Sequence, residues 1–302
     1  MIGRRARSTL AALLVGPLLA ACSGGAPATP SVSPGAHAAR VTKLLVVVVE
    51  NHSLDQMRRD LPYTFGLAKK YGYATGYTAL THPSEPNYLG IVGGDTFGVT
   101  DDGPPSEHVV HGRSVFGQAL ASGHTARVYA EGMTSSCALT DGGDRYAVKH
   151  NPWAYFVDER DACSVDDVSL DQLSPDVEAG HLPDAGLLVP NLCHDAHDAD
   201  CDLSDADAWM EEQLGLVMSG RDFESGRLAV VVTADEDDHH QDNKVLTAVF
   251  HPGLDGKVVS TPLTHYSLTR LYDDVLGVPH LRGAADAPDL AKAFGLDVGP
   301  AG

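Results

Sequence analysis

KLLVVVVE, residues 43–50, is a run of apolar and mostly β-branched residues that ends in a carboxylate. Such an uninterrupted run is typical of a strand that is buried on both faces of a parallel sheet. RLAVVVTADEDD (227–238) repeats this pattern and again ends in acidic residues. The same reasoning predicts shorter strands within residues 126–132, 186–191 and 245–251.

Segments with helical spacing separate these strands. Residues 51–70 predict a helix that is broken near Pro62, and Pro86 suits the start of a second helix that Gly93 and Gly94 would end. Further helices are expected at 114–121, 205–218 and 263–277. Strands that alternate with helices, without a repeat of fixed length, indicate one α/β domain with a mostly parallel sheet.

The first 40 residues differ from the rest. Residues 1–21 combine three arginines with a short apolar run, which is the pattern of an export signal and is too short to span a bilayer. The ending LAAC (19–22) resembles a bacterial lipobox, so we expect a lipid anchor on Cys22, with ordinary signal cleavage nearby as the alternative. Residues 22–40 predict a flexible tether, and 41–298 the folded domain.

Acidic residues dominate the charge of the chain. There are 41 Asp and Glu against 21 Lys and Arg, a net charge of −20, or about −23 once the arginines of the signal are removed. A nucleic acid is therefore not an expected partner, since binding its backbone needs a basic surface. An acidic protein that acts on phosphate groups needs a local cation, usually a metal ion.

Cys22 apart, the chain has four cysteines. An even number in an exported chain favours two disulfides. Of the three pairings we prefer the one between sequence neighbours, Cys137–Cys163 and Cys193–Cys201. A thiolate metal site is the alternative, although the spacings lack the CxxC form of zinc sites.

Polar residues gather where the predicted strands end. They lie in ENHS (50–53), THPSEPN (81–87), PNLCHDAHD (190–198) and ADEDDHH (234–240), while THYS (264–267) opens a helix. Ligands of open α/β sheets bind at these carboxyl ends. Oxygen donors together with imidazoles suit a divalent metal ion such as Mg, Mn, Ca or Zn.

Ser84 stands out because Pro83 and Pro86 restrict the backbone around it. A hydroxyl held in this way suits a nucleophile, and a metal ion would stabilise its alkoxide. A helix that begins at Pro86 would add a positive N-terminal end that favours a phosphoryl anion.

Each motif alone has a more ordinary explanation. A serine between prolines is commonly a turn, and DEDDHH is commonly a solvated acidic loop. HDAHD would fit an exposed loop held by a disulfide, His265 a helix cap, and His150 a loop histidine with satisfied hydrogen bonds. The joint occurrence of these motifs at strand ends is what indicates a site.

Taken in order, ENHS, THPSEPNYL, KHNPW (149–153), VPNLCHDAHD, VVVTADEDD and THYSL resemble the phosphoesterase family of bacterial acid phosphatases and phospholipases C, within the alkaline phosphatase superfamily. The resemblance spans roughly residues 43–280 and is greatest to small secreted acid phosphatases. It implies a three-layer α/β/α sandwich with its site at the carboxyl ends of the strands.

The resemblance also implies roles for single residues. Ser84 matches the nucleophile, and His265 or His150 would act as general acid. The metal-binding positions are Glu50, Asn51, Asp235 and Glu236. The positions expected to contact the substrate are Asn87, Asn191, His194 and Asp195.

Two departures from the family pattern affect how far these residue roles can be carried over to this chain. Ala234 stands where tryptophan is frequent, and Cys193 and Cys201 bracket the HDAHD loop. The chain also lacks the large C-terminal extensions of many phospholipases C. The sequence thus predicts an exported, metal-assisted phosphomonoesterase that acts through a phosphoserine on substrates including phosphoinositides or sugar phosphates. The rival hypotheses are a phospholipase C-type phosphodiesterase and a metal- or phosphate-binding lipoprotein without catalysis; the oligomeric state is left open.

Overall fold

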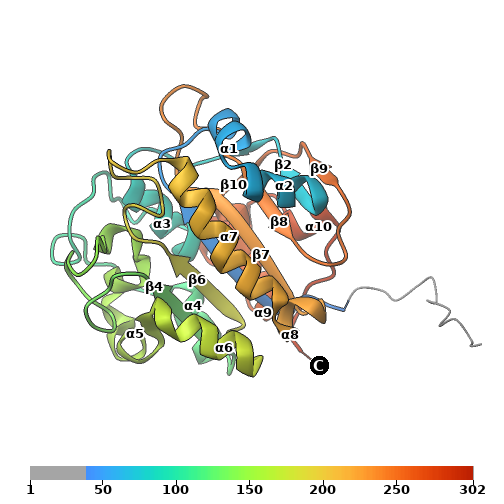
Figure 1. Ribbon diagram of the computed structural model, residues 1–302. Helices are drawn as coiled ribbons and strands as arrows, with labels where there is room; N and C mark the ends of the chain where they lie inside the picture. The colour runs from blue at the N-terminus through green and yellow to red at the C-terminus, as the bar shows by residue number, and fades with distance from the viewer. Residues whose placement is uncertain (1–38, 302) are drawn as a thin grey trace, which may run out of the picture. The chain divides into compact units, whose positions relative to one another are not determined.

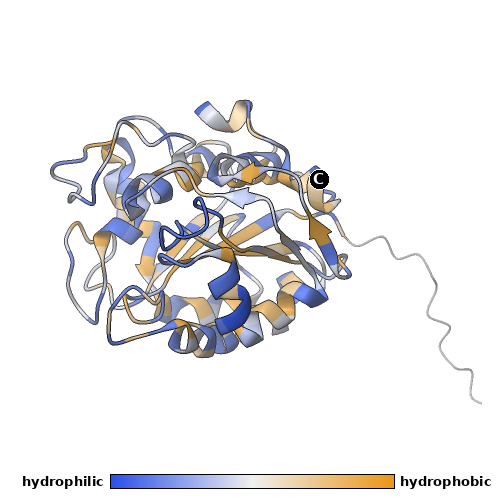
Figure 2. Cartoon of the chain, turned by 90° about the horizontal axis from the view of Figure 1, so that it is seen from above, coloured by the Kyte–Doolittle hydropathy of each residue, from blue (hydrophilic) through white to orange (hydrophobic). Residues whose placement is uncertain are grey.

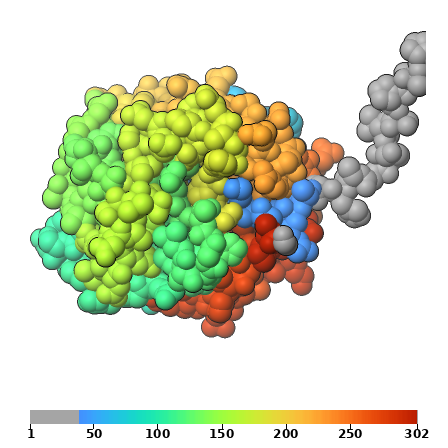
Figure 3. Space-filling model, turned by 90° about the horizontal axis from the view of Figure 1, so that it is seen from below, coloured from blue at the N-terminus to red at the C-terminus, as the bar shows by residue number. Residues whose placement is uncertain are grey.

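The computed structural model describes residues 39–301. The expected export signal, the lipid-bearing Cys22 and nearly all of the expected tether lie outside these residues. Within them, Val41 pairs with Val298, and Figure 3 shows the first described residues (blue) beside the C-terminal ones (red). Both ends of the described chain therefore lie near the start of the first strand, away from its carboxyl end.

An eight-stranded sheet forms the centre of the domain (Figure 1). Its neighbouring strands are all parallel except β8, which runs antiparallel to both β7 and β2. This confirms the predicted mostly parallel sheet. In spatial order the strands are β5 (Asp167–Ser169), β4 (Ala126–Ala130), β6 (Ala185–Val189), β1 (Lys43–Val49), β7 (Leu228–Ala234), β8 (Thr247–Phe250), β2 (Gly72–Ala74) and β9 (Lys257–Val259).

Helices cover both faces of this sheet, which confirms the three-layer α/β/α sandwich. One layer is built around α7 (Leu203–Ser219), which packs on α1 (Leu54–Asp60), α2 (Pro62–Lys70) and α6 (Leu173–Ala179). The other is built around α9 (His265–Leu276), which packs on α3 (Ser84–Gly93), α4 (Val115–Ala121) and α10 (Leu290–Phe294).

Shorter elements connect these layers. The remaining helices and strands are α5 (Arg160–Asp166), α8 (Arg221–Glu224), and the pair β3 (Tyr77–Thr78) and β10 (Leu263–Thr264). Single 3₁₀ turns occupy Val148–His150, Pro152–Tyr155, Val157–Glu159, Leu170–Gln172 and Arg282–Ala285.

The core lies along β1 and β7, whose side chains are fully buried from Leu44 to Val49 and from Leu228 to Ala234. Their apolar strands occupy the middle of the domain in the hydropathy view (Figure 2). β-Branched residues suit these positions because a strand covered on both faces must be apolar throughout. A rigid, dry sheet of this kind fixes the positions of the residues that follow each strand.

Three predicted segments differ from the structure. Helix α3 begins at Ser84, two residues before the proline that was expected to open it. The first two residues of the expected 263–277 helix instead form β10. Residues 157–185, for which the sequence predicts no helix or strand, contain α5, β5 and α6. Short strands such as β2 and β5 were missed because three residues carry too little periodicity.

Both preferred disulfides, Cys137–Cys163 and Cys193–Cys201, are present. This excludes a thiolate metal site at these four cysteines. Across residues 39–301, none of the helices is both long enough and apolar enough to cross a membrane.

Candidate active site

The carboxyl ends of β1 and β7 bring two of the predicted motifs together. These strands are neighbours, with Val49 opposite Ala234, so Glu50 and Asp235 leave the sheet side by side. The backbone N–H of Asn51 donates to Oδ1 of Asp235 over 2.9 Å, which ties the two strand ends to each other. Glu50 and Asp235 are fully buried, and Glu236 is 4% exposed.

Ser84 lies at the same place. It is the first residue of α3 and is 2% exposed, and its Oγ donates a hydrogen bond to Oε2 of Glu50 over 2.8 Å. The structure therefore joins the expected nucleophile to an expected metal-binding carboxylate. Because Ser84 opens a helix of ten residues, the positive end of the helix dipole lies beside this hydroxyl, although the N–H of Glu85 donates to Asp102 and Pro86 has none.

Asn87 holds the chain around Ser84 in place. Its Oδ1 accepts from the N–H groups of Leu80 and Thr81, and its Nδ2 donates to the carbonyl of Pro83 and, over 3.1 Å, to Oε2 of Glu236. The side chain is fully buried. The amide group fixes the loop that precedes the helix, and the expected contact of Asn87 with substrate stays a prediction.

The buried carboxylates are the feature most relevant to a metal. Burial together with the charges of Glu50 and Glu236 raises the pKa of Asp235 well above its ordinary value, and burial and Glu50 raise that of Glu236 to about 8. Oε1 of Glu50 and Oδ2 of Asp235 are buried without an aligned hydrogen bond, although Nε2 of His150 lies 3.2 Å from Oε1 of Glu50. Buried carboxylate oxygens that repel each other and lack aligned donors fit a divalent cation.

The predicted metal residues thus lie together, although Asn51 plays a different part from the carboxylates. Its side-chain Nδ2 donates to Oε2 of Glu50 over 3.1 Å and lies 3.0 Å from Nδ1 of His197. Its backbone is in the left-handed region, with φ of 54°, which asparagine tolerates better than most residues. This conformation turns the chain directly after β1, so that the side-chain amide of Asn51 points toward His197.

His150 connects Glu50 to Asp195. Its Nε2 lies 3.2 Å from Oε1 of Glu50 and its Nδ1 lies 2.9 Å from Oδ2 of Asp195. Burial opposes the charged imidazole, but these two carboxylates outweigh it and raise the pKa of His150 to about 10. Burial likewise opposes ionisation of Glu50, whose pKa is nevertheless held well below its usual range by His150. Tyr88 of α3 stacks on the ring with centroids 5.1 Å apart.

His265, the other expected general acid, is buried behind the site. Its Nε2 donates to the carbonyl of Asp235 over 2.6 Å, and its Nδ1 lies 3.0 Å from the hydroxyl of Tyr77. Burial lowers its pKa to about 4. A neutral imidazole with both nitrogens engaged and no exposed surface holds the backbone of Asp235 in position, and the expected proton transfer from His265 to a leaving group stays a prediction.

The remaining expected substrate contacts lie in the loop after β6. Oδ1 of Asn191 accepts from the N–H groups of Cys193 and His194, so its oxygen closes a turn. His194 lies 2.8 Å from Oε2 of Glu131 and stacks on Trp209, with ring centroids 6.0 Å apart. Both side chains line a depression of about 850 Å³ on the α7 side, which places His194 apart from the carboxylates.

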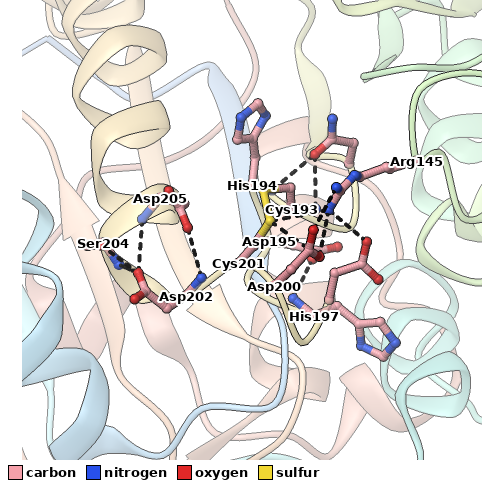
Figure 4. The surroundings of a disulfide bond; sticks show 12 residues. Arg145, Cys193, His194, Asp195, His197, Asp200, Cys201, Asp202, Ser204 and Asp205 are labelled. Carbon is pink, nitrogen blue, oxygen red and sulfur yellow. Dashed lines mark hydrogen bonds and ion pairs between the residues drawn. A yellow bond between two sulfur atoms is a disulfide. The ribbon is translucent and has the colours of Figure 1, made fainter.

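The Cys193–Cys201 disulfide closes this loop (Figure 4). Arg145 reaches over it and pairs with Asp198 at 3.1 Å and Asp200 at 2.9 Å. The disulfide and these ion pairs restrain the segment that carries Asp195 and His197.

Three residues near the site escaped the sequence prediction. His197 lies 3.4 Å from Oε2 of Glu50 and its side chain is 29% exposed. The charge of Lys149 partly opposes the rise in the pKa of Glu236 that burial and Glu50 cause, and its Nζ pairs with Oδ2 of Asp102 at 2.9 Å. His82 lies 3.1 Å from Oε2 of Glu236. All three residues belong to motifs identified in the sequence. The motifs, however, do not show which of their residues face the site.

Comparison with known proteins identifies the family. The model of the phosphoesterase family matches residues 50–279. The phosphatidylinositol-3-phosphatase of Mycobacterium tuberculosis is 28% identical over 94% of this chain and 92% of its own length. A probable acid phosphatase of Kluyveromyces lactis is 30% identical over 79% of this chain, which spans 59% of that protein.

A solved structure supports the fold. A protein of the alkaline phosphatase superfamily from Vibrio parahaemolyticus superposes with a TM-score of 0.56 at 9% identity, over 85% of this chain and 72% of the other. The chain belongs to the phosphoesterase family, as its motifs predicted, and is a phosphoric ester hydrolase.

Proposed function

We propose that this protein is an acid-phosphatase-like phosphomonoesterase in which Ser84 is the nucleophile. The observation that carries the proposal is the buried hydrogen bond of 2.8 Å from Oγ of Ser84 to Oε2 of Glu50, at the first residue of a helix. A binding protein has no need of a hydroxyl at this position. The neighbouring carboxylates and the helix N-terminus surround the same oxygen with groups that suit phosphoryl transfer.

In the proposed reaction, Oγ of Ser84 attacks phosphorus in line while the bond to the leaving-group oxygen breaks, which gives a phosphoserine and an alcohol. The proton of Ser84 is released to solvent in this step, because Glu50 accepts the hydrogen bond but its low pKa makes it a weak base. Water then attacks the phosphoserine, releases inorganic phosphate and restores the hydroxyl. Asn87 and His265 hold Ser84 and Asp235 in position during both steps. Asn87 binds the carbonyl of Pro83, which precedes Ser84, and His265 binds the carbonyl of Asp235.

The metal-binding residues in this proposal are Glu50, Asn51, Asp235 and Glu236. Their fit rests on the buried oxygens of Glu50 and Asp235 that lack an aligned hydrogen bond and on the raised pKa values of Asp235 and Glu236. A divalent ion bound there would lower the pKa of the Ser84 hydroxyl and offset charge on the phosphoryl oxygens.

We assign protonation of the leaving group to His197. Its Nδ1 faces Asn51 and Glu50, whereas its Nε2 makes no hydrogen bond within the described part of the chain and its ring is partly exposed. His150 and His265 are both buried: the nitrogens of His265 contact Tyr77 and Asp235, and His150 lies between the carboxylates of Glu50 and Asp195, with no aligned hydrogen bond at its Nε2. A general acid must reach the substrate, so an accessible imidazole suits this role better.

The expected substrates are phosphate monoesters. The similarity to the phosphatidylinositol-3-phosphatase of M. tuberculosis, which covers nearly the whole of both chains, makes phosphoinositides the first substrates to test. Lys149 provides a cation near the otherwise acidic site for the phosphoryl group.

Export and lipid anchoring form part of the proposal and rest on residues 1–22 alone. A Cys22→Ala variant expressed in a bacterial host should move from the membrane fraction to the soluble exported fraction. If the unchanged protein is never recovered with membranes, the lipid anchor is ruled out.

The decisive experiment compares p-nitrophenyl phosphate with bis(p-nitrophenyl) phosphate over a range of pH, for the unchanged protein and for Ser84→Ala, with and without a chelator. We expect monoester turnover that falls about 10,000-fold or more in Ser84→Ala. Ser225→Ala is a matched control, because its hydroxyl bonds near the opposite edge of the sheet.

Equal turnover by Ser84→Ala and the unchanged protein would remove Ser84 as nucleophile. Faster hydrolysis of the diester would indicate the phospholipase C-type activity instead. A folded protein that hydrolyses neither ester but binds phosphate or metal would indicate a binding lipoprotein. Loss of activity with chelator tests the metal separately.

A further inference from the structure

A second group of potential ligands lies beside the proposed active site and takes no part in the reaction described above. His82, Asp237 and His239 each offer one ligand atom, and the three atoms lie within 4.8 Å of one another. We call these three residues the His82 cluster. His82 lies two residues before Ser84, whereas Asp237 and His239 follow β7. The fold brings these distant parts of the chain together.

The distances within the His82 cluster suit a small transition-metal ion. Nε2 of His82 lies 3.4 Å from Oδ1 of Asp237, close to the separation of about 3.3 Å between two ligands of tetrahedral zinc. The rings of His82 and His239 approach to 3.9 Å between centroids. Asp237 is 1% exposed, whereas His239 is exposed, so an ion could enter from solvent and keep one position open to water.

The loop holds Asp237 firmly. Its Oδ1 accepts from the N–H of His239 over 2.8 Å, and its Oδ2 accepts from the N–H groups of Gln241 and Asn243 over 2.7 Å and 3.1 Å. A second lone pair on Oδ1 is free for a ligand. The carboxylate therefore needs little reordering to bind an ion.

His82 links this cluster to the proposed active site. Its Nδ1 is buried and makes no aligned hydrogen bond, yet it lies 3.1 Å from Oε2 of Glu236. An ion on Nε2 would place the proton of a neutral His82 on Nδ1, facing that carboxylate. Histidine ligands commonly show this arrangement of carboxylate, imidazole and metal.

We propose that the His82 cluster is a separate binding site for a divalent transition metal of the zinc class. Two imidazoles and one carboxylate with an open fourth position form a donor set that zinc and cobalt accept. Glu50, His150 and His197 offer a set of the same kind at the proposed active site, so the test must remove a ligand that belongs to the His82 cluster alone. The site is independent of the assignment of Ser84 as nucleophile, because none of its ligands touches that hydroxyl.

The test is a Zn²⁺ titration of the untagged, chelator-stripped protein in competition with a chromophoric chelator. The variant is His239→Asn, since asparagine adopts the positive φ of 65° at this position with little strain. His240→Asn is the matched control: it is the adjacent histidine, its ring is exposed, and its Nδ1 pairs with Asp238 at 3.0 Å.

We expect His239→Asn to bind one equivalent of Zn²⁺ fewer than the unchanged protein, or to bind that equivalent about tenfold or more weakly. The control should keep it, and the visible absorption of tetrahedral Co²⁺ should be lost in His239→Asn alone. Unchanged binding in His239→Asn, or an equal loss in His240→Asn, would overturn the proposal. Neither result depends on turnover, so failure here is distinct from failure of the Ser84 mechanism.

Discussion

The central sheet buries carboxylates in opposite ways at the two ends of its strands. We call the end where the parallel strands begin the amino edge, and the end where they finish the carboxyl edge. At the amino edge, Asp222 is 1% exposed and is paired with Arg227 at 2.7 Å and with Lys43 at 3.9 Å, while it also accepts from the N–H of Leu182. At the carboxyl edge, Glu50 and Asp235 are fully buried, and each keeps an oxygen without an aligned donor.

This difference separates a structural carboxylate from one that is ready for a ligand. A buried charge is tolerated when cations and donors satisfy it, as at the amino edge. At the carboxyl edge, Lys149 and His150 supply only part of the charge that Glu50, Asp235 and Glu236 require. The negative charge that remains uncompensated is the physical reason to expect a metal cation at the carboxyl edge.

The largest effect that would test this contrast is loss of activity in Asp235→Asn. We expect monoester turnover to fall at least about 1,000-fold, because the amide removes a charged oxygen from the proposed metal site. Since burial and two neighbouring carboxylates raise the pKa of Asp235, the same change should not lower stability in chelator. Turnover and urea unfolding measured on the same protein check both parts; a destabilised but active variant would contradict the contrast.

The next effect concerns the amino edge. Asp222→Ala removes a buried carboxylate that pairs with Arg227 and Lys43 and accepts from the N–H of Leu182, and leaves Lys43 only Asp184 and a carbonyl. The free energy of unfolding should therefore fall by about 3 kcal/mol. Turnover per folded molecule should stay unchanged, because the edge lies at the other end of the strands. Urea denaturation at fixed pH gives the stability, and a large loss of turnover in the folded fraction would count against separate edges.

A third buried carboxylate sharpens the comparison, because it has neither a cation nor a proposed ligand. Burial raises the pKa of Asp167 from 3.8 to about 8, although Asn151 donates to it over 2.8 Å. The folded protein therefore keeps a proton that the unfolded chain releases, and stability falls as pH rises between these values.

Asp167→Asn should remove this dependence. The gain in stability of the variant over the unchanged protein should grow with pH by up to about 1.4 kcal/mol per unit between pH 4 and 8. Urea midpoints at several pH values measure it. A constant difference across this range would show that Asp167 is not held protonated.

The smallest expected effect lies behind the carboxyl edge. Tyr77→Phe removes the hydroxyl that faces Nδ1 of His265, which should lower the free energy of unfolding by about 1 kcal/mol. Because His265 holds the backbone of Asp235, we also expect turnover to fall by about tenfold without a shift of the pH optimum. A shifted pH profile would instead favour His265 as the proton donor.

The sequence predicted the strands that define the sheet and the motifs that follow them. KLLVVVVE and RLAVVVTADEDD were predicted to be buried strands, because only a strand covered on both faces can be apolar throughout. In the structure they form β1 and β7, which are neighbours. The pairing of the four cysteines also followed from their order in the chain. Short elements such as β2 and the bridge between β3 and β10 could not be predicted, because their pairing depends on distant residues.

Within the site, the sequence supplied the residue types and the structure decided which of them face one another. Ser84, Glu50 and Asp235 are near because β1 and β7 pair in register and α3 begins beside them. Asn87 and His265 belong to the same motifs, yet packing turns their polar atoms inward.

The sequence by itself determined the α/β class, the family and the set of polar residues at the strand ends, because local periodicity and motif order are properties of the chain. Only the tertiary structure decided that His197 is partly exposed beside Glu50 and that His82 lies close to Asp237 and His239. The physical reason is that burial and donor–acceptor distances arise between segments that are far apart in the chain, and no local pattern encodes them.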